Sequence, residues 1–189
     1  MIVLSKEEFL LKRDLYRKMI EDGAVFIHPT DTIYGLGCDA RNSEAIKKIR
    51  DIKNRKDQPL SVIVPSKDWI LENCLTTGEI ADSLDKLPGA YTFLLNIDKK
   101  LAVSENVNPN EDSIGVRIPD NWFSKEVEFF GFPVISTSVN KQGNEFMTSI
   151  DDLDPEIKGL VDFIIYEGEK KGNSSHIIDY RFEDLEEEK

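Results

Sequence analysis

The feature that most constrains the fold is an alternation, along most of the chain, between apolar runs of strand length and segments with helical periodicity. In the helical segments apolar residues recur every three to five positions, as they do on one face of a helix. We expect strands at residues 24–27, 60–64, 90–97, 113–118, 132–136, 163–166 and 176–178. We expect helices at residues 9–20, 43–52, 67–73, 78–87, 121–130 and 151–160. This alternation predicts an α/β fold in which helices cover a sheet.

The lengths of the connections decide how the strands run. A parallel crossover needs about a dozen residues or more, and not every connection here is that long. We therefore expect a twisted sheet that mixes parallel and antiparallel strands and is flanked by helices, at the border between the α/β and α+β classes. No repeat or break in composition marks a second domain, so residues 1–189 are expected to form one domain with a solvated acidic tail at 183–189.

Polar residues and glycines set expectations for three individual segments. Residues 29–37 are rich in Thr and Gly, residues 137–142 are mostly polar, and both are expected to be loops. Residues 113–118 alternate between polar and apolar side chains. That alternation predicts a half-buried strand.

The charge balance excludes one class of function and leaves another open. The chain carries 36 acidic and 24 basic residues, which gives a formal net charge of −12. A general polyanion binder needs an excess of cations to displace counterions from phosphates, so this chain is not expected to coat nucleic acid. A local basic pocket remains open, because net charge governs solubility and steering rather than the chemistry of one site.

The sequence also bears on compartment, disulfides and metals. No apolar run approaches the roughly 20 residues that span a bilayer, and the first residues lack a signal-peptide pattern, so we expect a cytoplasmic protein without membrane contact. Cys38 and Cys74 form no CxxC pair and are expected to be free thiols rather than a disulfide. His28 and His176 stand alone, so no protein metal site is expected.

Four polar segments follow or interrupt apolar strands, which is where α/β proteins place ligands. They are residues 30–37, the pair Lys53 and Arg55, Arg117, and residues 136–140. The glycines of the first segment let backbone amides approach a small ligand, and the alternative is a glycine-containing turn with Tyr34 in the core. The last segment offers hydroxyl and amide groups to a phosphate, a ribose or a carboxylate, although such residues are also ordinary loop formers.

The basic residues among these candidates have two interpretations each. Lys53 and Arg55 can hold one phosphate together, Arg as a planar fork and Lys as a point charge. The alternative is that residues 47–56 form the solvated basic face of a helix. This is the one basic cluster of an acidic protein, which favours a functional role. Arg117 is flanked by apolar residues and is expected to pair with a carboxylate, either of a structural Asp or of a ligand.

These segments belong to a series of motifs in a distinctive order. Residues 28–40 read His-Pro-Thr-Asp-Thr-Ile-Tyr-Gly-Leu-Gly-Cys-Asp-Ala, and Lys53-x-Arg55 follows. The later motifs are Pro88-Gly89-Ala90-Tyr91-Thr92, Gly115-Val116-Arg117-Ile118-Pro119, Thr137-Ser138-Val139-Asn140 and Ser175-His176-Ile177-Ile178-Asp179. In content and order they closely resemble the YrdC-like family of threonylcarbamoyl-AMP synthases, from about residue 20 to residue 179.

The resemblance implies an enzyme that joins L-threonine, bicarbonate and ATP into threonylcarbamoyl-adenylate and releases pyrophosphate. It implies a downstream transferase that modifies the adenosine beside the tRNA anticodon, with only weak contact between this chain and tRNA. It further implies a twisted mixed sheet with an open concave groove. Mg²⁺ is expected to arrive with ATP, held mostly by phosphate oxygens and water.

The same resemblance assigns roles to nine residues. The catalytic group is Lys53, Arg55, Ser138 and Asn140. Threonine is contacted by Thr32, Arg117 and Ser136. ATP is contacted by Lys53, Arg55, Ser113, Ser138, Asn140 and Ser175. The arginine that follows the last family motif has its nearest counterpart in Arg181, whereas His28 and Cys38 are expected to be structural.

Two other functions compete with synthesis. The first is a YrdC-like module that binds tRNA or double-stranded RNA through residues 47–56 and makes nothing; the net charge of −12 counts against it. The second is a carbamoyl-adenylate-forming relative used in hydrogenase maturation. That activity normally sits in a much larger protein with acylphosphatase and zinc-finger-like segments, which this sequence does not contain.

Overall fold

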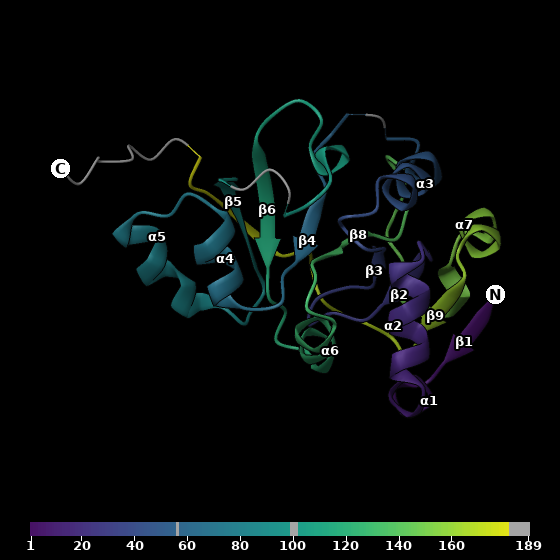
Figure 1. Cartoon of the computed structure of the whole chain (residues 1–189). Coiled ribbons are helices and arrows are strands. Elements are labelled where there is room, and N and C mark those ends of the chain that lie inside the picture. Colours follow the sequence, from purple (N-terminus) through teal and green to yellow (C-terminus); the bar gives the residue numbers. More distant parts are fainter. Residues whose placement is uncertain (56, 99–101, 182–189) are drawn as a thin grey trace.

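The strands form two mixed five-stranded sheets, as the computed structural model of the chain shows for residues 1–55, 57–98 and 102–181 (Figure 1). The first sheet has the order β1 (Ile2–Leu4), β9 (Phe163–Ile165), β2 (Phe26–His28), β3 (Gly35–Gly37), β8 (Thr137–Ser138). The second has the order β10 (His176–Asp179), β5 (Tyr91–Asn96), β6 (Ser113–Arg117), β4 (Ser61–Ile63), β7 (Val134–Ile135). The sheets adjoin at Ser136, because β7 ends just before this residue and β8 begins just after it.

Each sheet contains both parallel and antiparallel pairs, which confirms the predicted mixed architecture. In the first sheet β9 runs parallel to β1 and β2, whereas β3 runs antiparallel to β2 and β8. In the second sheet β5 runs parallel to β10 and antiparallel to β6, and β4 runs parallel to β6 and antiparallel to β7. The predicted single sheet is thus divided in two at Ser136.

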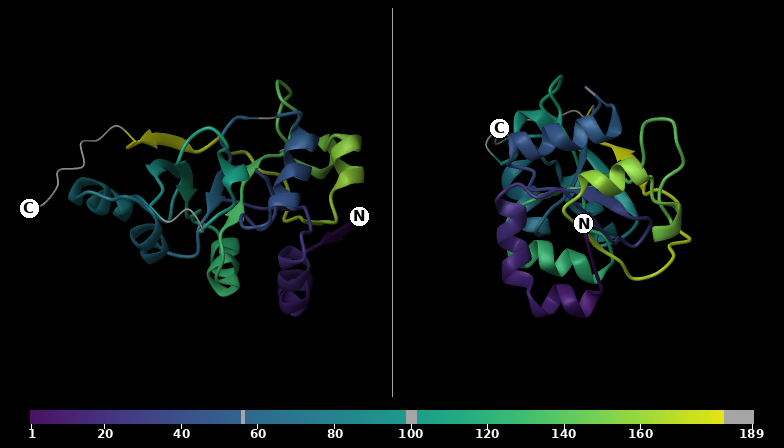
Figure 2. Two further views of the ribbon diagram at one scale, coloured as in Figure 1. Left: turned by 45° about the horizontal axis from the view of Figure 1, so that its top comes forward. Right: turned by 90° about the vertical axis from the view of Figure 1, so that its right-hand side faces the viewer.

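Helices lie on both sides of the strands (Figure 2). One side carries α1 (Lys6–Leu11), α2 (Arg13–Glu21) and α6 (Trp122–Phe130). The other carries α3 (Ser43–Lys53) and α7 (Pro155–Leu160). Next to β5 lie α4 (Lys67–Asn73) and α5 (Gly78–Ser83), and 3-10 turns occupy Leu84–Lys86, Glu105–Val107 and Ile150–Asp152 (Figure 1). None of the helices in the described ranges combines the length and the apolar character needed to cross a membrane.

Two apolar cores form because successive side chains of a strand point to opposite faces. Phe26 and Phe163 pack with residues of α1, α2 and α6 on one side. Ile27 and Ile164, their neighbours in sequence, pack with residues of α3 on the other. Full burial of one such side chain is worth about 1.5–3 kcal/mol. The short strands therefore read as continuous apolar runs, because both of their faces are covered.

Local caps explain why several helices begin where the sequence predicts. The Asn42 side chain accepts a hydrogen bond from the Ala45 amide at 3.0 Å, which satisfies an open donor of the first turn of α3. Ser66 does the same for α4 at 3.1 Å, and Asn121 for α6 at 2.9 Å. Gly131 ends α6 in the left-handed region with φ +74°, where glycine is free of strain.

Five local expectations are wrong. The first predicted helix is divided at Lys12 into α1 and α2, and α5 ends at Ser83 rather than at residue 87. Residues 35–37 and 137–138 are strands rather than loops, and all of β6 is buried. The sequence analysis also missed β1. The predicted acidic tail at 183–189 lies outside the described residues.

Candidate active site

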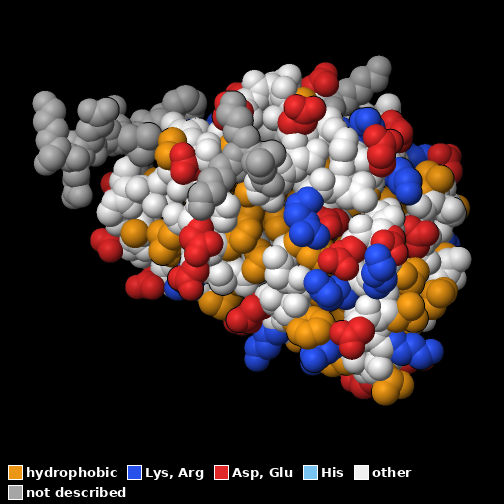
Figure 3. All heavy atoms as spheres, in the orientation of Figure 1, with side chains coloured by type: hydrophobic (Ala, Val, Ile, Leu, Met, Phe, Trp, Pro, Cys, Tyr) orange, Lys and Arg blue, Asp and Glu red, His pale blue; other side chains and the backbone are white. Residues whose placement is uncertain are grey.

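A pocket of about 390 Å³ brings together side chains from both sheets and from the loops between them. Its described lining includes Arg55, Arg117 and Arg181, and we call it the arginine pocket. Seven of the nine predicted site residues line it, namely Thr32, Arg55, Ser113, Arg117, Ser136, Ser138 and Ser175. No Asp or Glu is among its described lining residues, although acidic side chains are spread over the molecular face in Figure 3. The pocket is thus positively lined in an acidic protein.

The second sheet supplies one wall of the arginine pocket. Leu94, Gly115 and Ser61 stand in register on β5, β6 and β4, and all three line the pocket. A Cβ atom on Gly115 would lie 2.8 Å from Ser61 Oγ, so only glycine fits this central position without displacing a neighbour. The polar positions of β6 therefore face the pocket, which explains the alternation along this strand.

Lys53 and the loop after β8 form a compact cluster beside the pocket. The Lys53 Nζ donates to the carbonyl oxygens of Ser138 and Asn140 at 2.6 and 3.1 Å, and to Asn140 Oδ1 at 2.9 Å. Ser138 Oγ also donates to Asn140 Oδ1 at 2.7 Å. Burial, with Arg55 as a smaller cause, lowers the pKa of Lys53 to about 8. The structure thus joins three of the four predicted catalytic residues, and Ser138 is the one that reaches the pocket lining.

Arg55, the fourth predicted catalytic residue, lies in the lining itself. Its Nη2 donates to the Pro59 carbonyl at 3.0 Å, and its Nε is buried without a hydrogen-bond partner. Burial lowers the pKa of Arg55, but a guanidinium keeps its charge at any ordinary pH. A buried donor without a partner destabilises the free protein, and a hydrogen bond to an anionic ligand removes that free-energy cost.

Arg117 ends β6 and is buried in the pocket lining. Its Nη2 donates to Asp31 Oδ1 at 2.7 Å, and the Thr32 hydroxyl lies 3.5 Å away. The carboxylate that we expected near Arg117 is therefore a structural one in this state. Its Nε, like that of Arg55, is buried and lacks a partner. Burial lowers the pKa of Arg117, and Asp31 opposes that shift.

The remaining candidates lie in hydrogen-bonded pairs around the pocket. The Ser175 hydroxyl lies 2.7 Å from that of Thr92, and Ser113 Oγ donates to a Glu111 carboxylate oxygen at 3.1 Å. Arg181 reaches the lining as well, with its guanidinium bound to Glu111 and Asp179 at 2.7 Å each. Arg181, the arginine nearest to the last family motif, thus lines this pocket.

The solvated-face alternative for residues 47–56 is wrong for two of its cations. Lys53 is buried, and so is Arg50, whose guanidinium donates to the carbonyls of Asn106 at 2.7 Å and Gln58 at 3.0 Å. Arg50 thus ties the segment before β4 to the 3-10 turn at Glu105–Val107, a structural role that its place in a basic run did not reveal. Lys47 is exposed and pairs with Glu44, as the alternative predicts. Lys56 lies outside the described residues.

His28 and Cys38 are buried and do not line the arginine pocket. The His28 ring stacks on Phe123 with 4.8 Å between centroids, and burial lowers its pKa to about 4, so it is neutral at pH 7. Burial also raises the pKa of the Cys38 thiol far above its usual range, which makes it unreactive. Both placements fit the structural roles that we expected. Cys38 and Cys74 are free thiols, as predicted.

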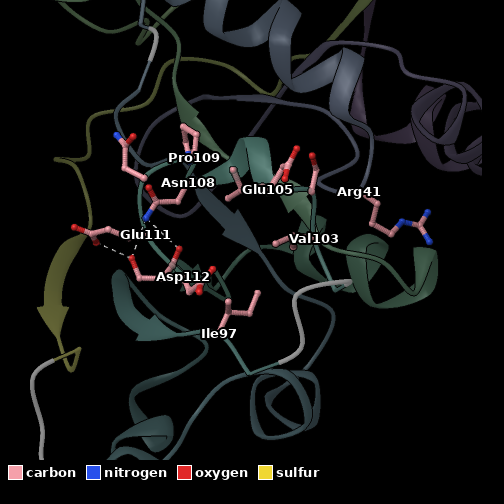
Figure 4. Close-up of a pocket in the computed structure, with 12 residues that line it drawn as sticks. Arg41, Ile97, Val103, Glu105, Asn108, Pro109, Glu111 and Asp112 are labelled. Atoms are coloured by element: carbon pink, nitrogen blue, oxygen red, sulfur yellow. Dashed lines mark hydrogen bonds between the residues drawn. The ribbon is translucent and has the colours of Figure 1, made fainter.

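A second and larger hollow, of about 650 Å³, is shown in Figure 4. Its described lining includes Glu105, Glu111 and Asp112, and we call it the acidic hollow. Ser113 is the one predicted site residue in that lining. The larger volume therefore does not mark the candidate active site, because most of the predicted residues line the smaller pocket.

Two residues that shape the arginine pocket were missed as functional candidates. Asp31 lies within the first motif, but its type alone gave it no role beside its threonine neighbours. Gly172 lies in the segment between β9 and β10, where an added Cβ would collide with the Thr32 carbonyl oxygen. Only the folded chain brings these residues together, so no local signal could have identified Gly172.

The arrangement of the arginine pocket defines a class of binding site. Guanidinium groups bind carboxylates and phosphates, and clustered hydroxyls supply further hydrogen bonds. In the described lining, Ser138 and Ser175 are bonded to Asn140 and Thr92, and the Glu111 oxygen that accepts from Ser113 is also bound to Arg181, so none of these three serines is paired with a free base. The site is suited to binding anionic substrates and to group transfer between them without a covalent protein intermediate.

Comparison with known proteins assigns the family. The model of the Sua5, YciO and YrdC proteins, described as telomere recombination, matches residues 18–186. A Methanocaldococcus jannaschii protein to which threonylcarbamoyl-AMP synthase activity is ascribed is 34% identical over 170 residues, which cover 89% of this chain and 79% of that protein. The threonylcarbamoyl-AMP synthase of Vibrio campbellii is 31% identical, and the match covers 83% of this chain and 86% of that protein. The chain belongs to the Sua5/YciO/YrdC family.

Solved structures agree with this assignment. The crystal structure of P. abyssi Sua5 with L-threonine has a TM-score of 0.82 and 27% identity, and it covers 94% of this chain. This chain spans 53% of that protein. The E. coli YciO structure, at 22% identity, shows the same fold with a TM-score of 0.82, and it covers 96% of this chain and 90% of its own.

Proposed function

We propose that this protein is a nucleotidyltransferase that makes threonylcarbamoyl-adenylate from L-threonine, bicarbonate and ATP. The observation that carries the proposal is the arginine pocket, which gathers seven of nine predicted site residues around three guanidinium groups. The names of the relatives point to the same reaction. The P. abyssi relative was crystallised with L-threonine, which supports threonine as the amino acid.

The proposed reaction has two bond-forming steps. The threonine amine attacks bicarbonate to give threonine carbamate and water. A carbamate oxygen then attacks the α-phosphorus of ATP, the bond to the bridging oxygen breaks, and pyrophosphate leaves. The carbamate is unstable in water, so the pocket has to hold it in line with the phosphate and exclude solvent.

The pocket residues divide this work by their chemistry. Arg117 binds the threonine carboxylate, with Thr32 and Ser136 beside the amino acid. Arg55 takes the phosphates, and its position in the lining, with an Nε that has no protein partner, supports that role. Lys53 keeps the loop of Ser138 and Asn140 in place at the edge of the pocket, so that the Ser138 side chain faces the ligand.

Ser113 and Ser175 complete the proposed ATP contacts. Both line the arginine pocket, from β6 and from the start of β10. Mg²⁺ belongs to the same proposal as part of the Mg·ATP substrate. Since the described lining offers hydroxyl oxygens but no carboxylate, phosphate oxygens and water would hold the ion. Bound there, it neutralises charge on the phosphates as pyrophosphate leaves.

The product has to reach another protein. Threonylcarbamoyl-adenylate is a reactive mixed anhydride, so we propose a downstream transferase that places the threonylcarbamoyl group on the adenosine beside the tRNA anticodon. The proposal includes a cytoplasmic site of action and only weak tRNA contact. RNA binding alone is not favoured, because Arg50 and Lys53 are buried and bound to protein oxygens.

Pyrophosphate release tests the proposal. The protein is incubated with ATP, Mg²⁺, bicarbonate and threonine, and each component is omitted in turn. We expect release only when threonine and bicarbonate are both present. Release that is independent of either one would contradict the proposed reaction, and so would no release from the complete mixture.

A further inference from the structure

Asp31 links two elements that meet at the arginine pocket. Its Oδ1 accepts the hydrogen bond of Arg117 Nη2 at 2.7 Å, and its Oδ2 accepts that of the Asp120 backbone amide at 3.0 Å. One carboxylate thus fastens the last residue of β6 and the turn before α6 to the loop after β2. The pair is well shielded from water, with side-chain exposures of 7% for Arg117 and 11% for Asp31.

The loop that carries Asp31 is itself held rigidly. Thr30 Oγ1 donates to the Ile33 carbonyl at 2.7 Å and accepts from the Thr32 amide at 3.1 Å. The Thr30 and Thr32 hydroxyls lie 3.0 Å apart. Asp31 is therefore presented from a fixed turn, and Thr32, the next residue, lines the pocket beside Arg117.

We propose that Asp31 is a positioning residue that sets the orientation of the Arg117 guanidinium for the carboxylate of threonine. The inference rests on the proposed function and deepens it. Arg117 lines the arginine pocket and Asp31 does not, so Asp31 acts through Arg117. By occupying Nη2, Asp31 leaves the other guanidinium donors for a ligand, including the Nε that has no protein partner.

Two physical effects give Asp31 this role. A long arginine side chain has many rotamers, and a charge-assisted hydrogen bond at one end selects the one that faces the pocket before threonine arrives. The carboxylate also offsets the cost of burying the Arg117 charge, which burial alone disfavours. Without Asp31, threonine would have to order and neutralise the guanidinium by itself.

The test compares the substrate dependence of Asp31 variants. We expect Asp31→Asn to raise the KM for threonine about ten- to a hundredfold, the range for loss of a hydrogen bond between charged groups, and to change the KM for ATP less than twofold. Asp31→Glu keeps the charge at a longer reach, and we expect it to recover part of the threonine affinity. Asp14→Asn, on an exposed face of α2, is the matched control.

A double-mutant cycle separates positioning from a general structural role. If Asp31 acts through Arg117, adding Asp31→Asn to Arg117→Ala leaves the threonine KM unchanged within twofold. An equal fold-loss in both backgrounds would overturn the inference, and so would a wild-type threonine KM in Asp31→Asn. Threonine titration calorimetry on each variant gives the same comparison as binding constants, and thermal unfolding shows which variants remain folded.

The wild-type protein separates this inference from the proposed function. If it releases no pyrophosphate with threonine and bicarbonate and binds no threonine, the proposed function and the role of Asp31 fall together. If it is active and Asp31→Asn behaves as wild type, the proposed function stands and the role of Asp31 is contradicted.

Discussion

The arginine pocket and the acidic hollow share Ser113 but differ in charge and in size. The smaller arginine pocket has three guanidinium groups and no carboxylate in its described lining. The larger acidic hollow has Glu105, Glu111 and Asp112 in its described lining together with one arginine, Arg41, whose guanidinium is paired with Asp39 (Figure 4). Because an anion binds where donors converge without competing carboxylates, the arginine pocket is the place for phosphate and carboxylate chemistry.

The comparison also shows where the charges behind the net charge of −12 lie in the structure. The acidic side chains are spread over the surface and in the acidic hollow, whereas the pocket cations are held by neighbours such as Asp31 and Asp179 from outside the lining. An acidic protein thereby keeps one site that is positive at short range, where screening by water and salt is weakest.

The largest effect is expected at Arg55, the arginine of the pocket lining that has no carboxylate partner among the described ion pairs. Arg55→Ala is expected to lower the kcat/KM for pyrophosphate release about a hundredfold, because charge that builds on the phosphates loses a fixed donor. Arg13→Ala, at an exposed position of α2 outside the pocket lining, is the control and is expected to match the wild type. Equal activities for both variants would remove Arg55 from the site.

A smaller effect is expected from filling the space beside Thr32. Gly172→Ala adds a methyl group that collides with the Thr32 carbonyl oxygen, so the segment or the threonine loop has to shift. We expect the threonine KM to rise about tenfold, as typical overpacking costs predict. Gly159→Ala is matched, because nothing lies within 4 Å of its added Cβ. A threonine KM unchanged by Gly172→Ala would show that the segment is not part of the site.

The pH dependence should reveal Lys53. Its pKa of about 8 predicts that kcat/KM falls about fivefold between pH 8 and pH 9, since the ammonium loses the proton that fastens the loop of Ser138. Unfolding is not the reason, because a pKa below the ordinary value of 10.5 means that the contribution of Lys53 to stability rises from pH 8 upward. Lys53→Arg is expected to move the alkaline limb beyond pH 9. A profile that Lys53→Arg leaves unchanged would assign the limb to another group.

The smallest effect is expected in the acidic hollow. Glu105→Gln removes one exposed carboxylate of its lining. We expect kcat/KM for threonine and for ATP to stay within twofold, and the free energy of unfolding to change by less than about 0.5 kcal/mol. A tenfold loss in steady-state kinetics would instead place part of the reaction in this hollow.

The sequence predicts best those parts of the fold that local interactions decide. The starts of α3, α4 and α6 lie within one residue of the prediction, and each follows a residue whose side chain caps the helix, namely Asn42, Ser66 and Asn121. The strand at Gly35–Gly37 was missed for a non-local reason. An added Cβ on Gly35 would collide with the His28 ring 2.6 Å away, so tight packing requires glycine where propensity predicts a loop.

The same distinction applies to the site. The motifs identified seven residues that line the arginine pocket, and the sequence also showed the alternation of polar and apolar residues in β6. The strand was expected to be half-buried and is fully buried, because sequence shows which residues alternate but not what covers them. Asp31 and Arg117 are 86 positions apart, so their ion pair exists only in the folded chain.

A crystal structure of the protein with threonine and a non-hydrolysable ATP analogue tests the central claim most directly. We predict threonine in the arginine pocket, its carboxylate on Arg117 with Asp31 still bound to Nη2, and the phosphates beside Arg55 and Ser138. Threonine in the acidic hollow, or phosphates that approach neither Arg55 nor Ser138, would contradict the account.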